Sequence, residues 1–230
     1  MNVLIIGGSS DIGLSLAEYL DNLGYNVIST YNKHKFELEN IDVMNCDIRD
    51  KDSIEKLFTY VLDRYASIDL LINLASISMD NDFLSKAKNE FMRVLEVNLV
   101  GTFLCNQVYC KYISNGMIIN ISSTDGLDTY NNYDIDYAAS KAGGISISKS
   151  ISKCTNNKVL CVCPNWIDSG TTRGMDSSFL KSELSRIKQD RLISIDEFNS
   201  SIYKIINGNY KSGSVIRVDV RDGLLWIEKV

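Results

Sequence analysis

The feature that most constrains the fold of this chain is an alternation of short apolar runs with longer amphipathic segments. The apolar runs predict buried strands over Val3–Ile6, Asn26–Thr30, Met44–Cys46, Leu70–Leu74, Met117–Ile121, Val159–Cys163 and Val215–Val218. The amphipathic segments predict helices over Ile12–Leu23, Asp52–Tyr65, around Phe91–Tyr112, and over Tyr137–Lys149, Phe179–Arg186 and Ile195–Ile206. Apolar strands that alternate with helices are typical of a parallel sheet covered on both faces.

This pattern predicts an α/β fold: a doubly wound, Rossmann-type sheet of about seven parallel strands with helices on both faces. The length of 230 residues and the absence of a linker-like stretch predict one domain spanning residues 1–230. Sheets of this kind bind ligands at the carboxyl ends of their strands. We therefore expect the chemistry of this chain directly after the predicted strands.

Composition narrows the class of partner. The formal net charge is −5 and no long run of Lys or Arg occurs, which argues against a nucleic-acid partner. His34 is the only histidine, so we expect neither a metal site nor a Ser-His-Asp triad. The six cysteines form no C-x-x-C pair and are predicted to be buried reduced thiols. No apolar run approaches the roughly 20 residues that cross a bilayer, and no leader precedes the first strand, so we expect no membrane partner and a cytoplasmic location.

A glycine turn follows the first predicted strand, as Gly7-Gly8-Ser9-Ser10-Asp11-Ile12-Gly13. A turn of this kind lets backbone N–H groups and the helix N-terminus meet a pyrophosphate. Gly13 would let the helix pack closely on the strand. An ordinary βα turn is the alternative, and the Asp11 carboxylate would lie near an anionic ligand unless its side chain caps the helix.

A second signal is Tyr137-Ala-Ala-Ser-Lys141, whose spacing puts Tyr137 and Lys141 on one helix face. A nearby ammonium would lower the tyrosine pKa from about 10, so that the phenol exchanges a proton near neutral pH. The same spacing also occurs on ordinary surface helices. Upstream, a predicted strand ends in Ser122-Ser123, and the Ser123 hydroxyl would bond a substrate oxygen, with Ser122 as the alternative.

Together these motifs resemble the short-chain dehydrogenase/reductase family, and broadly its 3-oxoacyl-[acyl-carrier-protein] reductases. The residues that match the family's G-x-x-x-G-x-G turn, serine motif and Tyr-x-x-x-Lys motif are Gly7, Gly13, Ser123, Tyr137 and Lys141. Asp11 replaces the middle glycine of the turn. The resemblance runs from about Val3 to Asp219, where the segment that resembles the family's final G-x-x-I-x-V-D strand ends.

Further segments extend the resemblance in the family's order. Asn73 and Ala75 match its N-N-A-G strand end, whereas Leu74 and Ser76 replace the other two residues. Asn73 is thereby expected to steady the central strand and the ribose side of the cofactor. Asp47, after the third strand, matches the family's adenine-contacting aspartate, with a simple helix cap as the alternative.

Two more segments match beyond these. The segment around Asn98 resembles the helix that carries the family's catalytic asparagine, which implies that Asn98 holds a water linking the active-site lysine to solvent. On its own, an asparagine in an apolar helix would be a local hydrogen-bonding defect. Pro164, Ile167 and Ser169 match the P-G-x-I-x-T segment that positions the nicotinamide carboxamide. Asn165 replaces its glycine, a replacement we expect to be tolerated because asparagine adopts positive φ more readily than most residues.

The resemblance implies an NAD(P)(H)-dependent oxidoreductase that reduces a carbonyl to an alcohol, or the reverse. Tyr137 would donate the proton, Ser123 would polarise the oxygen, Lys141 would bind the ribose and lower the tyrosine pKa, and Asn98 would support the proton relay. The implied cofactor contacts are Gly7, Ser9, Ser10, Ile12, Gly13, Asn32, Lys33, Asp47, Ile48, Asn73, Ala75, Tyr137, Lys141, Pro164, Ile167 and Ser169.

The end of the second strand predicts the choice of dinucleotide. An acidic residue there would bond the ribose 2′-hydroxyl and repel a 2′-phosphate. This chain has Thr30-Tyr31-Asn32-Lys33 instead, and the next carboxylate is Glu37. We therefore expect NADP(H) to be preferred, with Asn32 or Lys33 beside Ser10 holding the 2′-phosphate. NAD(H) is the alternative, in which Lys33 is an ordinary solvated lysine.

The sequence is less specific about substrate and assembly. Trp166, Met175, Phe179, Tyr130 and Tyr133 are candidates for the walls of a substrate pocket. Arg173, Lys181, Arg186 and Lys188 would meet a phosphorylated carrier protein, or else form a solvated helix face. The resemblance implies a homodimer or homotetramer. Two rival functions stay open: a non-catalytic dinucleotide-binding sensor or scaffold, and an isomerase or dehydratase on the same fold.

Overall fold

The computed structural model describes residues 1–230. The strands are β1 (Asn2–Ile6), β2 (Asn26–Tyr31), β3 (Asp42–Asn45), β4 (Leu70–Asn73), β5 (Met117–Ile121), β6 (Lys158–Pro164), β7 (Val215–Arg221) and β8 (Leu224–Lys229). The α-helices are α1 (Asp11–Asn22), α2 (Lys51–Tyr65), α3 (Lys88–Leu95), α4 (Thr102–Tyr112), α5 (Ile135–Ile151), α6 (Gly170–Arg173), α7 (Ser177–Arg186) and α8 (Ile195–Ile206). A π-helix, η1 (Glu96–Gly101), joins α3 to α4, and a short 3-10 helix, η2 (Thr124–Gly126), follows β5.

All strands belong to one sheet in the order β3-β2-β1-β4-β5-β6-β7-β8. The strand β1 pairs in parallel with β2 on one side and with β4 on the other. The chain order therefore reverses at β1, which makes the space beyond β1 and β4 the switch point where such sheets bind ligands. The predicted doubly wound parallel sheet is confirmed.

The sheet has one more strand than predicted, since β8 pairs with β7 in antiparallel fashion. The two strands are joined through Asp222 and Gly223, whose φ angles are 52° and 72°. Two consecutive positive φ values are the geometry of a tight hairpin turn, for which Asp-Gly is a strong sequence signal. The prediction that the last strand ends at Val218 overlooked this signal.

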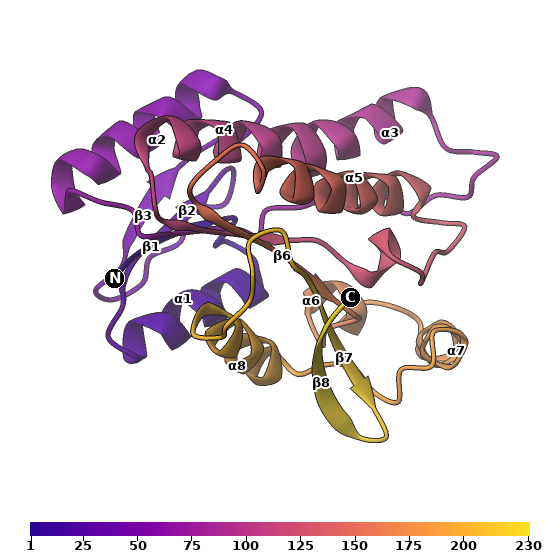
Figure 1. Cartoon of the computed structure of the whole chain (residues 1–230). Helices are drawn as coiled ribbons and strands as arrows, with labels where there is room; N and C mark the ends of the chain where they lie inside the picture. The colour runs from indigo at the N-terminus through magenta and orange to yellow at the C-terminus, as the bar shows by residue number, and fades with distance from the viewer.

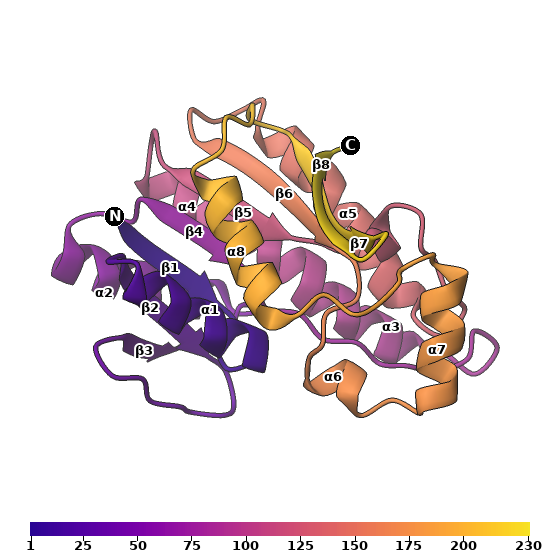
Figure 2. The same ribbon diagram turned by 90° about the horizontal axis from the view of Figure 1, so that it is seen from below.

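Helices cover both faces of the sheet (Figures 1 and 2). One buried cluster joins the sheet to α1 and α8, and includes Ile5, Leu16 and Phe198. The opposite cluster joins the sheet to α2 and α4, and includes Leu4, Phe58 and Tyr109. Neighbouring residues Leu4 and Ile5 of β1 thus pack on opposite faces, which explains why the strand is apolar throughout.

The long helical region after β4 differs in one detail from the prediction. It runs without a break from Lys88 to Tyr112, but its middle widens into the π-helix η1, which contains Asn98. Such π-turns often occur at functional sites and have no clear signature in hydrophobic periodicity.

No helix combines the length and apolar composition that a bilayer crossing requires. All six cysteines are free, and the predicted burial is confirmed for four of them, whereas Cys110 is half-buried and Cys154 is exposed.

Candidate active site

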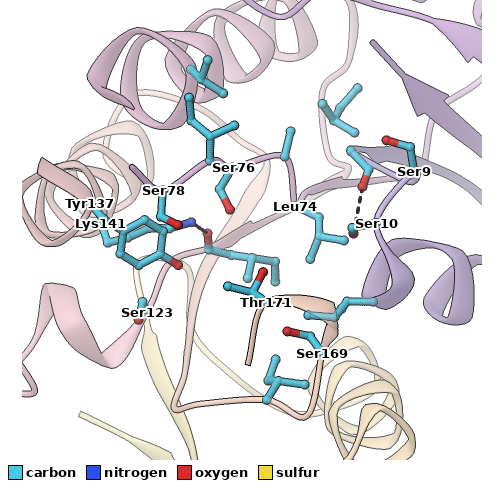
Figure 3. A pocket seen from close by; sticks show the side chains of 18 of the residues that line it. Ser9, Ser10, Leu74, Ser76, Ser78, Ser123, Tyr137, Lys141, Ser169 and Thr171 are labelled. Carbon is cyan, nitrogen blue, oxygen red and sulfur yellow. Dashed lines mark hydrogen bonds between the residues drawn. The ribbon is translucent and has the colours of Figure 1, made fainter. Parts of the chain in front are cut away.

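A cavity of about 520 Å³ lies at the switch point, and its walls come from the segments that follow β1, β2, β3, β4, β5 and β6. The predicted site residues that line it are Gly7, Ser9, Ser10, Ile12, Asn32, Lys33, Asp47, Ile48, Ala75, Ser123, Tyr137, Lys141, Pro164, Ile167 and Ser169. Gly13, Asn73 and Asn98 do not line it but lie behind its walls. Figure 3 shows that Ser9 and Ser10 lie at one end and Tyr137 and Ser123 at the other.

The glycine turn after β1 is shaped by close backbone contacts. Gly7 has a φ of +95°, and a Cβ atom on it would lie 2.5 Å from the backbone N of Ala75. A Cβ on Gly13 would lie 2.6 Å from the Gly7 carbonyl oxygen. Neither position accommodates a side chain, so α1 begins directly beneath the turn. The first N–H groups of a helix lack intrahelical partners, so the turn and this helix start fit an anionic pyrophosphate.

Asp11 plays a different part from the helix cap considered above. The N-cap of α1 is Ser10, whose Oγ accepts a hydrogen bond of 3.0 Å from the Gly13 N–H. The Asp11 carboxylate instead accepts from the N–H of Gly170 at 2.6 Å and from that of Ile12 at 3.0 Å. Asp11 therefore ties the glycine turn to the segment after β6, and its charge stays on the cavity wall.

Polar side chains after β2 and β3 form the outer end of the cavity. Asn32 and Lys33 are exposed on its wall. Asp47 accepts hydrogen bonds of 2.9 and 2.5 Å from the Arg49 guanidinium, which lowers the pKa of Asp47. The Asp47 carboxylate, which also interacts with the Asn32 side chain, is therefore already paired with a cation.

The inner end gathers the residues of the tyrosine and serine motifs (Figure 3). The Nζ of Lys141 lies 5.2 Å from the centre of the Tyr137 ring and donates a 3.0 Å hydrogen bond to the Ile121 carbonyl oxygen. The Ser123 side chain lies beside the Tyr137 phenol. Ser122, the alternative serine, donates to the Lys141 carbonyl oxygen at 2.7 Å, so its hydroxyl is occupied by the backbone of α5.

Burial controls proton affinity at this end. Desolvation raises the pKa of Tyr137, and the negative charges of Asp125 and Asp134 raise it further. Desolvation lowers the pKa of Lys141 to about 8. The predicted lowering of the tyrosine pKa is therefore not found in the protein alone, because burial disfavours the charged phenolate.

Three carboxyl groups on the cavity wall were not predicted: Asp80, Asp125 and Asp134. Burial, followed by the neighbouring carboxyl of Asp80, raises the pKa of Asp134 to about 8. Burial also raises the pKa of Asp125. Ser76 faces the Tyr137 phenol as well. The family resemblance did not mark these positions, since Ser76 departs from the matching motif and the other three lie outside any motif.

Two predicted asparagines hold the walls rather than face the cavity. Asn98 accepts from the Ile77 N–H at 2.8 Å and donates to the Ile77 carbonyl oxygen at 2.8 Å and to Ser140 Oγ at 3.1 Å. Its amide thus pins the segment after β4 to α5, and the implied water-holding role stays a prediction. Asn73 is buried and donates to Asn106 at 2.9 Å and Asn120 at 2.8 Å, so it steadies β4 and β5 from within the core.

Asn165 also departs from expectation. Its φ is not positive, so conformational tolerance does not explain why asparagine replaces glycine here. Its amide donates to Asp219 Oδ1 at 3.0 Å, and its oxygen accepts from the Thr124 hydroxyl at 3.1 Å. Asn165 therefore links β6 to β7 and to η2 through its side chain.

The segment after β6 covers the inner end of the cavity. Phe179 of α7 packs edge-to-face on Tyr133 with ring centres 6.0 Å apart. Arg186 donates to the carbonyl oxygens of Tyr130 at 2.7 Å and Thr129 at 3.2 Å. Two of the four basic residues considered for a carrier protein are thus engaged internally: Arg186 by these carbonyls, and Arg173 by Asp168 at 2.8 Å.

Comparison with known proteins agrees with this geometry. The family described as short chain dehydrogenase matches residues 1–178. The chain is 28% identical to the 3-oxoacyl-[acyl-carrier-protein] reductase MabA of Mycobacterium avium, over 95% of this chain and 88% of that protein. It is 31% identical to the 3-oxoacyl-[acyl-carrier-protein] reductase FabG of Thermotoga maritima, over 78% of this chain and 76% of that protein.

Solved structures share the fold. A short chain dehydrogenase from Bacillus anthracis superposes with a TM-score of 0.83 at 26% identity, covering 95% of this chain and 94% of its own. ElxO with NADP bound has a TM-score of 0.78 at 24% identity, covering 94% and 96%. A short chain dehydrogenase from Leptospira borgpetersenii with bound NAD+ has a TM-score of 0.82 at 24% identity, covering 97% and 92%. The sheet order, the glycine turn and the family match agree, and this chain belongs to the short chain dehydrogenase family.

Proposed function

We propose that this protein is an NADP(H)-dependent reductase that converts a carbonyl into an alcohol, with Ser123, Tyr137, Lys141 and Asn98 as its catalytic set. The observation that carries the proposal is the position of Tyr137, Lys141 and Ser123 on one wall of the cavity whose far end is the glycine turn. A bound nicotinamide dinucleotide supplies or accepts the hydride.

Each side chain has a role that follows from its contacts. Tyr137 keeps its proton at neutral pH because its pKa is raised, so it is suited to donate that proton to the developing alkoxide. Ser123 orients the substrate oxygen beside the phenol. Lys141 carries a charge below a pH of about 8 and would bind the ribose hydroxyls. Asn98 acts as a positioning residue, because it fixes the cavity wall at Ile77.

The preference for NADP(H) over NAD(H) is part of the proposal. It is supported by Asn32 and Lys33, which line the outer end of the cavity. Neither residue is the acid that would bond a ribose 2′-hydroxyl and favour NAD(H). Asp47, the nearby acid, is paired with Arg49, which reduces its repulsion of a 2′-phosphate. A lower Michaelis constant for NADPH than for NADH is the expected result, and equal use of both would remove this part of the proposal.

The names of the relatives favour a substrate linked to a carrier protein. Arg173 and Arg186 are bonded within the protein, so Lys181 and Lys188 are the remaining basic candidates for contact with a phosphorylated carrier protein. Comparing a free β-ketoester with the same acyl group on acyl carrier protein distinguishes the two substrate classes.

A homo-oligomer is also proposed, since Met92, Val100 and Phe103 expose 52%, 45% and 39% of their surfaces along α3–η1–α4.

The decisive test is Tyr137→Phe in a ketone panel with NADPH. We expect about a 100- to 10,000-fold loss of turnover, since a positioned acid contributes that much, while NADPH affinity measured by fluorescence stays within a few-fold. The matched control is Tyr133→Phe, at an exposed tyrosine that packs on Phe179. Full turnover of Tyr137→Phe would refute the catalytic assignment, and NADPH binding without any turnover of the parent protein would favour a sensor.

A further inference from the structure

Ser123, the serine of the proposed catalytic set, has a buried acidic partner, Asp125. The Ser123 hydroxyl donates to Asp125 Oδ2 at 3.1 Å, and the Asp125 N–H donates back to Ser123 Oγ at 3.1 Å. The Thr129 hydroxyl lies 2.9 Å from the other carboxylate oxygen, Oδ1. Asp125 is only 5% exposed. Because both oxygens face hydroxyl donors, the arrangement suits the ionised carboxylate.

Close packing fixes this carboxylate near the other catalytic groups. A Cβ on Gly126, the next residue, would lie 2.6 Å from the backbone N of Ala142 and the carbonyl carbon of Lys141. The 3-10 helix η2 therefore rests directly on α5, one turn beyond Tyr137. Asp125 lines the cavity from this position, and its charge acts on both Tyr137 and Lys141.

We propose that Asp125 is a positioning residue of this active site: it holds the Ser123 hydroxyl in place until the hydroxyl turns to donate to the substrate oxygen, and its buried carboxylate places a negative charge beside the Tyr137 phenol. This inference rests on the proposed reductase function. Its consequence is a bias toward carbonyl reduction, because a neighbouring anion disfavours the phenolate and keeps the proton that Tyr137 must donate.

The other charges at this end differ from that of Asp125 in their partners or in the pH range where they act. Asp134 has a pKa near 8, so it is largely protonated at neutral pH and adds its charge only at higher pH. Asp136 is buried in an ion pair of 3.0 Å with Lys86. The titratable groups that face the site are Asp125 from η2, Asp134 ahead of α5 with Asp80 beside it, Asp136 and Lys141 within α5, Lys86 from the segment before α3, and Glu183 and Arg186 from α7. Arg186 is itself paired with Glu183 at 2.7 Å, which moderates its effect on Asp125.

The test compares pH profiles of three variants, each checked for folding by its thermal unfolding midpoint. Asp125→Asn removes the charge and keeps a hydrogen-bonding side chain. We expect the Tyr137 limb of the profile to move to lower pH by about one unit, in both reduction and alcohol oxidation. Asp125→Glu keeps the charge and should leave the limb in place. Asp128→Asn removes an exposed carboxylate from the same loop, which pairs with Arg217, and should overlay the parent profile.

A second readout separates the hydrogen bond from the charge. Asp125→Ala removes both, so it should show the same shift and an additional loss of about tenfold in turnover on the acidic plateau. Where Asp125→Asn does not fold, Asp125→Ser serves as the charge-removing variant. A limb that stays at the parent position in every folded variant lacking the carboxylate would overturn the proposal.

The inference can also be tested if the proposed reaction fails. If the parent protein turns over no carbonyl compound, the reductase assignment is lost, but the ionisation of Tyr137 can be followed by NMR of protein labelled at tyrosine Cζ. Tyr137→Phe assigns the resonance. Asp125→Asn should then lower the apparent Tyr137 pKa relative to the parent, and an unchanged or higher value would overturn the role given to Asp125.

Discussion

The two ends of the cavity are built by different means. The outer end, where the dinucleotide would bind, is made of backbone: a glycine turn with a φ of +95° at Gly7, the open first turn of α1, and exposed side chains such as Lys33. The inner end is made of buried side chains, with Ser123 6%, Asp125 5% and Lys141 5% exposed. Ser123 donates a hydrogen bond to Asp125, Lys141 donates to the backbone of β5, and the neighbouring Ser122 donates to the backbone of α5.

This difference has consequences for energetics. Backbone N–H groups bind an anion with little dependence on side-chain identity, whereas a buried charge depends strongly on its partners. Substitutions at the outer end should therefore change affinity for the dinucleotide, and substitutions at the inner end should change stability and proton affinity. The following predictions test that division.

The largest effect on stability is expected at the inner end, from Lys86→Met. Lys86 and Asp136 form a buried ion pair whose side chains are 5% and 0% exposed, and Asp136 also accepts from the Tyr137 N–H. Removing the lysine leaves a buried, unpaired carboxylate, so the free energy of unfolding should fall by about 3–5 kcal/mol. Urea unfolding of the variant and the parent protein measures this loss. Lys111→Met, which breaks the exposed pair with Glu55, should cost at most about 1 kcal/mol. Equal losses in both variants would contradict the division.

The next effect concerns Gly7→Ala at the outer end. The substitution adds a strained φ and a clash with Ala75, so we expect a stability loss of about 1–3 kcal/mol and at least about a tenfold loss of dinucleotide affinity. Gly24→Ala is the matched control, because Gly24 has a φ of +84° and open space around its Cβ position. That variant should lose stability only. Intact NADPH binding by Gly7→Ala, measured by fluorescence titration, would argue against the turn as the pyrophosphate site.

A smaller effect is expected for Lys33→Ala. Loss of one charged contact to a 2′-phosphate should raise the Michaelis constant for NADPH by about tenfold and leave that for NADH unchanged. Lys35→Ala removes a lysine that pairs with Glu37 and does not line the cavity, and it should change neither constant. Parallel changes for both dinucleotides in Lys33→Ala would indicate a nonspecific role.

The smallest effect is a pH dependence of dinucleotide binding. The Lys141 pKa is lowered to about 8, so the ammonium is present below that pH and is lost as the pH rises through it. NADPH affinity should therefore weaken by a few-fold between about pH 7 and 9, a change that corresponds to less than about 1.4 kcal/mol. In Lys141→Met the affinity should be lower and flat over this range. A flat profile for the parent protein would show that Lys141 is not the titrating contact.

Prediction from the sequence was most successful where one residue or one local spacing carries the information. The glycine turn, the Tyr137–Lys141 spacing and the seven parallel strands all depend on local periodicity and on glycine's lack of a side chain. The strand β8 could have been predicted from the Asp-Gly turn that precedes it, but this signal was overlooked. The π-helix around Asn98 could not be predicted, since its hydrophobic pattern does not differ from that of an α-helix.

The amino-acid sequence by itself determined the strand–helix alternation, the family and the placing of Tyr137 and Lys141 on one helix face, because these depend on short-range patterns. Only the tertiary structure decided which side chains surround that tyrosine. Asp125 lies outside the residues matched to a motif and Ser76 departs from the motif in which it falls, yet both act on the phenol. Asp11 ties the glycine turn to Gly170 across 159 positions of the chain. Such contacts arise from packing between elements distant in the chain, and packing also sets the desolvation that controls every pKa in the site.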